Sequence, residues 1–192
     1  MWLQENEIYH VFNRGNNKQD IFLTEDNYPY FLSKVQRWVV PCCDLLAWCL
    51  MPNHFHFLIH ANQYSIQEIK DGSFSRQRFS QNIKQLLSSY TKAVNKQMGR
   101  TGHLFQQKTK AKCVSENNNE WPETAFHYIH QNPMRAGLVS RLEDWPYSSF
   151  SEYLNQNKGG MCNQSLARQI LNINFNRIYE ESYEVLREVS YT

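Results

Sequence analysis

The chain has 192 residues, of which 41% are hydrophobic and 20% are charged, and its formal net charge is only +2. These values predict a soluble globular protein with one core-forming domain, and they exclude disordered and fibrous classes. The sequence contains no run of 18 apolar residues and no signal-peptide pattern, and its five cysteines show no disulfide or zinc-type spacing. We therefore expect a cytoplasmic protein with reduced thiols and no membrane partner.

The first half of the chain shows one strand, one helix and a strand pair. Residues 7–15 (EIYHVFNRG) are aromatic and β-branched and predict a strand. Apolar residues recur at helical spacing over 25–40, and Pro41 ends that pattern. The apolar run 44–51, the turn at Pro52-Asn53 and residues 54–60 then predict two neighbouring strands.

The second half begins with a polar linker around Gly72 and a helix over about 75–98. A strand is predicted over 103–114, and a helix from Pro122 to Pro133. Residues 165–175 and 178–189 predict further helices. We divide the chain into a catalytic-type domain, 1–154, and a C-terminal helical tail, 155–192.

The order β-α-β-β-α-β indicates the fold class. It predicts an α+β fold with a ferredoxin-like split β-α-β core, a four-stranded antiparallel sheet, helices on one face and a C-terminal helical extension. Because this fold supports many functions, function has to be argued from particular residues.

Positive charge is concentrated in the middle of the chain. Residues 70–112 hold ten of the 20 lysines and arginines, with Asp71 as their one acidic residue. Such a segment favours a polyanionic partner, although a solvated helix face would explain the charge alone equally well.

The stretch MPNHFHFLIH places His54 and His56 on one face of a strand, because side chains alternate along a strand. Two imidazoles that point the same way can hold one divalent ion, although an isolated pair is more often structural. On the helix predicted from Pro122 to Pro133, Tyr128 and Asn132 are four residues apart and share a face. A phenol, an amide oxygen and two imidazoles form a coherent set for metal-assisted phosphoryl transfer.

Several blocks together resemble a known family. MPNHFHFLIH is similar to the His-hydrophobic-His signature of the HUH endonucleases, and HYIHQNPMRAGLV with WPYSSF resembles their single-tyrosine branch. IYHVFNRG and YTKAVNKQMGRTGHLFQQKTKA resemble the first strand and the basic helix-strand unit of the REP-associated tyrosine transposases. The resemblance spans about residues 5–154, with the blocks in the family's order.

The resemblance implies a function and a site. His54, His56 and Asn132 would bind Mg²⁺ or Mn²⁺, and Tyr128 would attack single-stranded DNA, leaving a 5′-phosphotyrosine link and a free 3′-OH. The implied activity is nicking and joining of hairpin DNA in DNA transposition, by a monomer or a homodimer. Two departures concern DNA specificity: a longer segment over 62–80, and Gln106 and Gln107 in the basic block.

The predicted DNA-binding surface combines cations, an amide and an aromatic ring. Its members are Asn13, Arg14, Arg76, Arg78, Lys84, Lys92, Arg100, Phe105, Lys108 and Lys110. Two alternatives remain open beside the transposase. One is a hairpin-binding protein with inactive chemistry, and the other is a metal-dependent phosphoesterase that uses water as its nucleophile.

Overall fold

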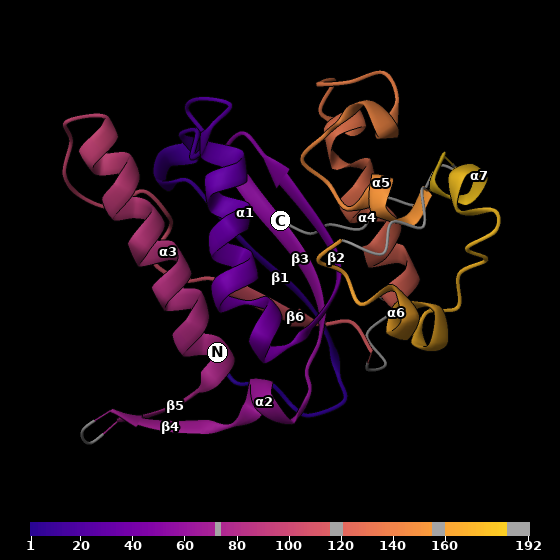
Figure 1. The fold of residues 1–192 in the computed structure, drawn as a ribbon, viewed down its shortest axis with the longest axis horizontal. Coiled ribbons are helices and arrows are strands. Elements are labelled where there is room, and N and C mark those ends of the chain that lie inside the picture. The colour runs from indigo at the N-terminus through magenta and orange to yellow at the C-terminus, as the bar shows by residue number, and fades with distance from the viewer. Residues whose placement is uncertain (72–73, 116–120, 155–159, 184–192) are drawn as a thin grey trace.

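The computed structural model describes residues 1–71, 74–115, 121–154 and 160–183. Its strands are β1 (Ile8–Arg14), β2 (Asp44–Met51), β3 (His54–His60), β4 (Glu68–Asp71), β5 (Phe74–Gln77) and β6 (Lys110–Cys113). Its α-helices are α1 (Asn27–Trp38), α2 (Gln63–Ile66), α3 (Arg78–Gln97), α4 (Pro122–Arg135), α5 (Phe150–Leu154), α6 (Gln164–Ile170) and α7 (Ile178–Tyr183) (Figure 1).

The main sheet has the strand order β2-β3-β1-β6, and every neighbouring pair is antiparallel. Helix α1 connects β1 to β2, and α3 leads from the β4-β5 hairpin into β6. This connectivity and order are those of a split β-α-β sheet. The predicted fold class, with its four-stranded antiparallel sheet, is confirmed.

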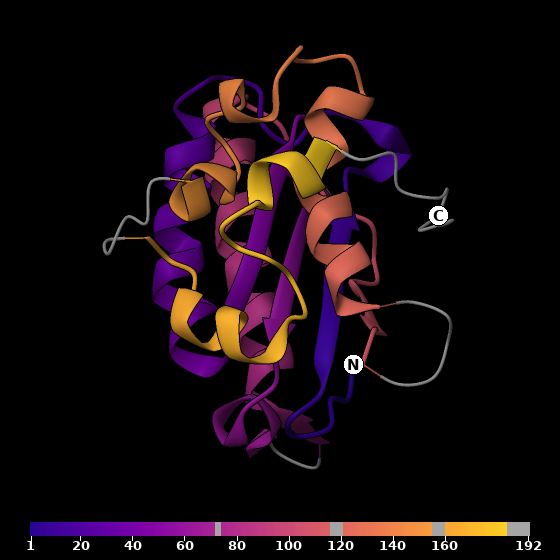
Figure 2. The ribbon, with the colours of Figure 1, turned by 90° about the vertical axis from the view of Figure 1, so that its right-hand side faces the viewer.

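Helices cover both faces of this sheet, so the prediction of helices on one face is wrong. Helices α1 and α3 pack on the face that carries Val11, Phe55 and Phe57, whereas α4 packs on the face that carries Leu46 and Leu58. Figure 2 shows α4 to α7 in front of the sheet and α1 and α3 behind it. The reason is visible in β2, whose apolar residues are buried on both sides and therefore need two covering layers.

Two stretches differ from their predicted structure. The stretch around Gly72, predicted as a polar linker, contains α2 and the strands β4 and β5, and β5 extends to Gln77, where the sequence predicted the start of a helix. The predicted strand over 103–114 is regular only at Lys110–Cys113. Residues 104–106 nevertheless follow the end of β1, because Asn16 donates to the Leu104 carbonyl and Gln106 donates to the Arg14 carbonyl.

The C-terminal helices pack on α4 and β2. Ala167, Leu171 and Ile178 join the same buried cluster as Phe126 and Ile129 of α4. The division of the chain at residues 154 and 155 stays a prediction, and residues 155–159 and 184–192 lie outside the described part. No helix in the described ranges is both long and apolar enough to cross a membrane.

Candidate nucleic-acid active site

The histidine pair lies at the start of β3, directly after the Pro52-Asn53 turn. His54 faces Arg14 in the register with β1, and His56 faces Phe12. The centres of the two imidazole rings are 4.8 Å apart, with the planes nearly perpendicular. Both side chains thus project from the same face of the sheet, as the alternation along the strand predicts.

Each of these imidazoles is held by a hydrogen bond on its Nδ1 side. His54 Nδ1 lies 2.5 Å from Asn53 Oδ1, and His56 Nδ1 lies 2.8 Å from His10 Nε2. His56 Nε2 is buried and has no hydrogen-bond partner among the described residues. Burial lowers the pKa of His54 to about 4 and that of His56 well below 6.5, so both rings are neutral at physiological pH.

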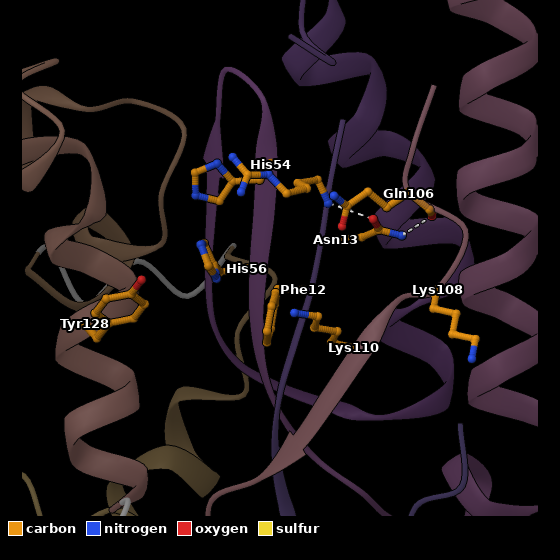
Figure 3. Close-up of a pocket in the computed structure, with 9 residues that line it drawn as sticks. Phe12, Asn13, His54, His56, Gln106, Lys108, Lys110 and Tyr128 are labelled. Atoms are coloured by element: carbon orange, nitrogen blue, oxygen red, sulfur yellow. Dashed lines mark hydrogen bonds between the residues drawn. The ribbon is translucent and has the colours of Figure 1, made fainter. Parts of the chain in front are cut away.

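Tyr128 approaches the histidines from α4. Ala125, Phe126 and Ile129 of this helix are buried against the sheet, which leaves Tyr128 half-buried beside the pair. Its ring centre lies 5.9 Å from that of His56, and its hydroxyl is turned toward the histidines (Figure 3). Burial raises the phenol pKa, while the Arg135 guanidinium and the Asn132 amide oppose that shift.

A pocket opens between α4, β1, β3 and the segment before β6. It is lined by Phe12, Asn13, Arg14, His54, His56, Gln106, Lys108, Lys110 and Tyr128 (Figure 3). Three of these residues are cations, and no acidic side chain is among the described residues that line the pocket. This arrangement fits an anionic substrate that can be brought against a phenol and two neutral imidazoles.

Asn132 does not line the pocket. Its side chain is 9% exposed, and its Nδ2 donates to the carbonyl oxygen of Tyr128 at 2.8 Å. The described residues contain no group of three or more His, Cys, Asp or Glu that could hold a metal. The predicted third ligand therefore has its amide nitrogen bonded to its own helix and lies outside the described lining of the pocket.

The other histidines of α4 point away from Tyr128, as the helical spacing predicts. His127 Nδ1 lies 2.9 Å from the Ser182 hydroxyl of α7. His130 Nε2 lies 2.8 Å from the Ser149 hydroxyl, and the ring is fully buried. Both have structural roles in joining α4 to its neighbours.

The predicted DNA-binding residues divide into two groups. Arg14, Lys108 and Lys110 line the pocket, and Arg100 reaches Gln19 at the same end of the sheet, donating to its Oε1 at 3.0 Å. The other group lies elsewhere. Arg76 lies on β5, Arg78 is the first residue of α3, and Lys84 and Lys92 are exposed along α3. Since α3 covers the opposite face of the sheet, this second group does not share the pocket.

Two predicted contacts with bases are not available in this structure. Phe105 is 7% exposed and packs in the core beside Phe31 and Phe55, so it offers no stacking surface. Asn13 is 4% exposed, and its amide donates to the Gln106 carbonyl and to the Thr109 hydroxyl. Asn13 instead fixes the 106–109 segment against the end of β1.

The sequence reasoning missed His10 and Phe12. Both lie on β1 on the same side as the histidine pair, with ring centres 5.0 Å and 5.9 Å from that of His56. The alternation of His10, Phe12 and Arg14 along the predicted first strand carried this signal. Phe12 and Arg14 line the pocket, and His10 contacts the pocket residue His56.

No family model matches the chain. A curated protein of Haemophilus influenzae, named as a candidate REP-associated tyrosine transposase, is 25% identical over 109 residues, which cover 56% of this chain and 58% of that protein. Over this stretch the chain is similar in sequence to that protein. The match spans little more than half of that relative's length.

A solved structure shares the fold. The structure of a REP-associated tyrosine transposase bound to a REP hairpin matches with a TM-score of 0.58, covering 84% of this chain and 87% of that one. The two sequences are 14% identical over this match. The likeness therefore concerns the arrangement of sheet and helices, and the chemistry has to be argued from the pocket.

Proposed function

We propose that this protein is a metal-dependent, single-strand-specific DNA endonuclease and strand transferase that acts on hairpin DNA, as a REP-associated tyrosine transposase would. The observation that carries the proposal is the pocket in which Tyr128 faces two neutral histidines and three cations. A phenol, two histidines that can bind one metal ion and a cationic lining together suit attack on a phosphodiester.

The two histidines fit a divalent cation, Mg²⁺ or Mn²⁺. A ligand imidazole has to be neutral, and both rings are. His56 presents a buried Nε2 without a partner in the described structure. Asn53 Oδ1 can only accept, so His54 carries its proton on Nδ1 and keeps a lone pair on Nε2. Asn132 would complete the set after rotation of its side chain.

In the proposed reaction, Arg14, Lys108 and Lys110 bind phosphates of a single strand next to a hairpin. A bound cation would neutralise charge on the scissile phosphate and favour ionisation of the phenol. The Tyr128 oxygen forms a bond to phosphorus while the bond from phosphorus to the 3′-oxygen breaks. The phenol proton passes to water, the 3′-oxygen takes a proton from water, and a 5′-phosphotyrosine remains. Attack by a 3′-OH reverses these changes and joins strands.

One observation favours the alternative of a hairpin-binding protein with inactive chemistry. Asn132 bonds to its own helix, so of the three predicted ligands only His54 and His56 line the pocket. A protein of this kind would bind the same hairpins and cut none of them.

A cleavage assay separates these readings. Hairpin oligonucleotides with single-stranded flanks are incubated with Mn²⁺ and the wild type, His54→Ala or His56→Ala, with the exposed His103→Ala as a matched control. We expect cleavage that chelator abolishes and that both pocket variants reduce by at least about 100-fold. Hairpin binding without cleavage by the wild type would support the inactive alternative, and full cleavage by His54→Ala would exclude the proposed site.

A further inference from the structure

His10 is a fully buried histidine in the middle of β1. In the register between β1 and β3, His10 pairs with Leu58. His56 lies two residues before Leu58 on β3, and its ring lies beside that of His10. The two ring centres are 5.0 Å apart, with an angle of 21° between the planes. His10 Nε2 lies 2.8 Å from His56 Nδ1, which is hydrogen-bond distance.

A hydrogen bond between two neutral imidazoles needs one donor and one acceptor. If His56 donates from Nδ1, its Nε2 carries a lone pair. If His10 donates from Nε2, His56 carries its proton on Nε2 and cannot bind a metal there. The bond to His10 therefore determines whether His56 can act as a ligand.

The neighbouring histidine shows which arrangement suits the pocket. Asn53 Oδ1 accepts the proton of His54 Nδ1, which leaves the His54 Nε2 lone pair for a ligand. The same arrangement in His56 would present both Nε2 atoms, and the His56 Nε2 is buried without a partner in the described ranges. Metal-bound histidines usually donate their second ring N–H to an acceptor that fixes tautomer and orientation.

We propose that His10 is a positioning residue of the metal site: its Nε2 accepts the His56 Nδ1–H bond and holds His56 in the tautomer whose Nε2 faces the pocket. This inference rests on the proposed function, because it assigns His56 as a metal ligand. His10 itself lies behind His56 and is not among the residues that line the pocket.

The first test reads the tautomer without metal. Long-range ¹H–¹⁵N correlation spectra of the metal-free protein at pH 7.5 distinguish protonated from unprotonated ring nitrogens. His56→Gln assigns the His56 signals. We expect a protonated Nδ1 and an unprotonated Nε2 in His56. A proton on Nε2 of His56 would overturn the proposal, whatever the protein does with DNA.

The second test measures Mn²⁺ affinity by calorimetry in His10→Phe and His10→Gln. Phenylalanine fills the space but accepts no hydrogen bond, whereas the glutamine amide oxygen can replace the lost acceptor. We expect His10→Phe to weaken Mn²⁺ binding by about 10- to 100-fold and His10→Gln to restore most of the affinity. The matched control is His60→Asn, at the opposite end of β3.

The outcomes separate the two proposals. Unchanged affinity in a folded His10→Phe variant would overturn the role of His10 and leave the proposed function standing. A wild type that binds no Mn²⁺ would contradict the metal-dependent function itself. The tautomer is measured in the metal-free wild-type protein. That measurement therefore shows which histidine donates the bond between His10 and His56 even if His10→Phe does not fold.

Discussion

The phenol of Tyr128 is mostly un-ionised at neutral pH and is therefore a weak nucleophile, because burial raises its pKa above the usual value. At neutral pH the attacking group is therefore a hydroxyl, which has to lose its proton during attack. The guanidinium of Arg135, 6.0 Å from the ring centre, favours the phenolate, and so does the amide of Asn132. The proposed cation would act in the same direction.

Arg135 gives a prediction about pH. Replacing it with glutamine removes a charge that lowers the Tyr128 pKa, so the phenolate fraction at a given pH falls by up to about tenfold for each unit of upward shift. We expect Arg135→Gln to slow cleavage at pH 7.5 and to move the pH–rate profile to higher pH. The exposed Arg177→Gln serves as control. A slower rate with an unshifted profile would assign Arg135 to DNA binding instead.

Phe12 gives a prediction about stacking. Its ring lines the pocket with the Lys110 ammonium 5.5 Å from the ring centre, whereas Phe105, predicted for this role, is buried in the core. We expect Phe12→Ala to weaken binding of single-stranded DNA by about 1–3 kcal/mol in a fluorescence anisotropy titration. Phe105→Leu should leave that affinity unchanged and lower the melting temperature. The reverse result would restore Phe105 as the stacking residue.

At the scale of elements, the position of Tyr128 depends on how α4 is held. On its sheet side α4 packs on β2 and β3, and on its other side it contacts α7. Gln131 Nε2 donates to the Ser182 carbonyl at 2.6 Å, one turn from the contact between His127 and the Ser182 hydroxyl. The C-terminal segment thus supports the helix that carries the proposed nucleophile.

Removing one of these contacts tests that support. Gln131→Ala leaves the buried Ser182 carbonyl without this donor, which we expect to cost about 1–3 kcal/mol in urea unfolding. Hydrogen exchange of α7 amides should become faster, and cleavage should fall while Mn²⁺ affinity stays unchanged. The control is Gln169→Ala, an exposed position on α6. Unchanged α7 exchange would show that α7 is held by other contacts.

The sequence predicts the elements of this fold better than their layers. Periodicity located α1, α3 and α4, and alternation on β3 placed His54 and His56 on one face, because both signals are local. The second helical layer was missed, since a continuous apolar run such as β2 does not show which elements cover its two faces. Phe105 was misassigned because exposure depends on packing against Phe31 and Phe55, which are distant in sequence.

At the scale of the whole molecule, several buried histidines link stability to pH. Burial lowers the pKa of His10 to about 3 and those of His54 and His127 to about 4, against 6.5 for a free side chain. The unfolded chain therefore binds more protons than the folded protein between about pH 6.5 and 4. Stability is fully present above pH 6.5 and is lost as the pH falls through this window.

We expect the melting temperature to fall steeply between pH 6.5 and 4.5 in calorimetry or circular dichroism. His127→Gln removes one of the titrating groups and keeps a partner for Ser182, so its melting temperature should depend less on pH in that window. His103→Gln, in an exposed loop, should follow the wild type. Equal slopes for His127→Gln and the wild type would contradict the linkage at His127.

The proposed reaction requires that Tyr128 becomes covalently bonded to DNA. The most direct measurement is capture of that adduct: labelled hairpin DNA is incubated with Mn²⁺ and the protein, and the mixture is separated on a denaturing gel. We expect a labelled protein band that disappears with chelator and in Tyr128→Phe, and that persists when the exposed tyrosine of α2 is replaced in Tyr64→Phe. Cleavage that continues in Tyr128→Phe without any covalent band would exclude Tyr128 as the nucleophile and indicate water instead.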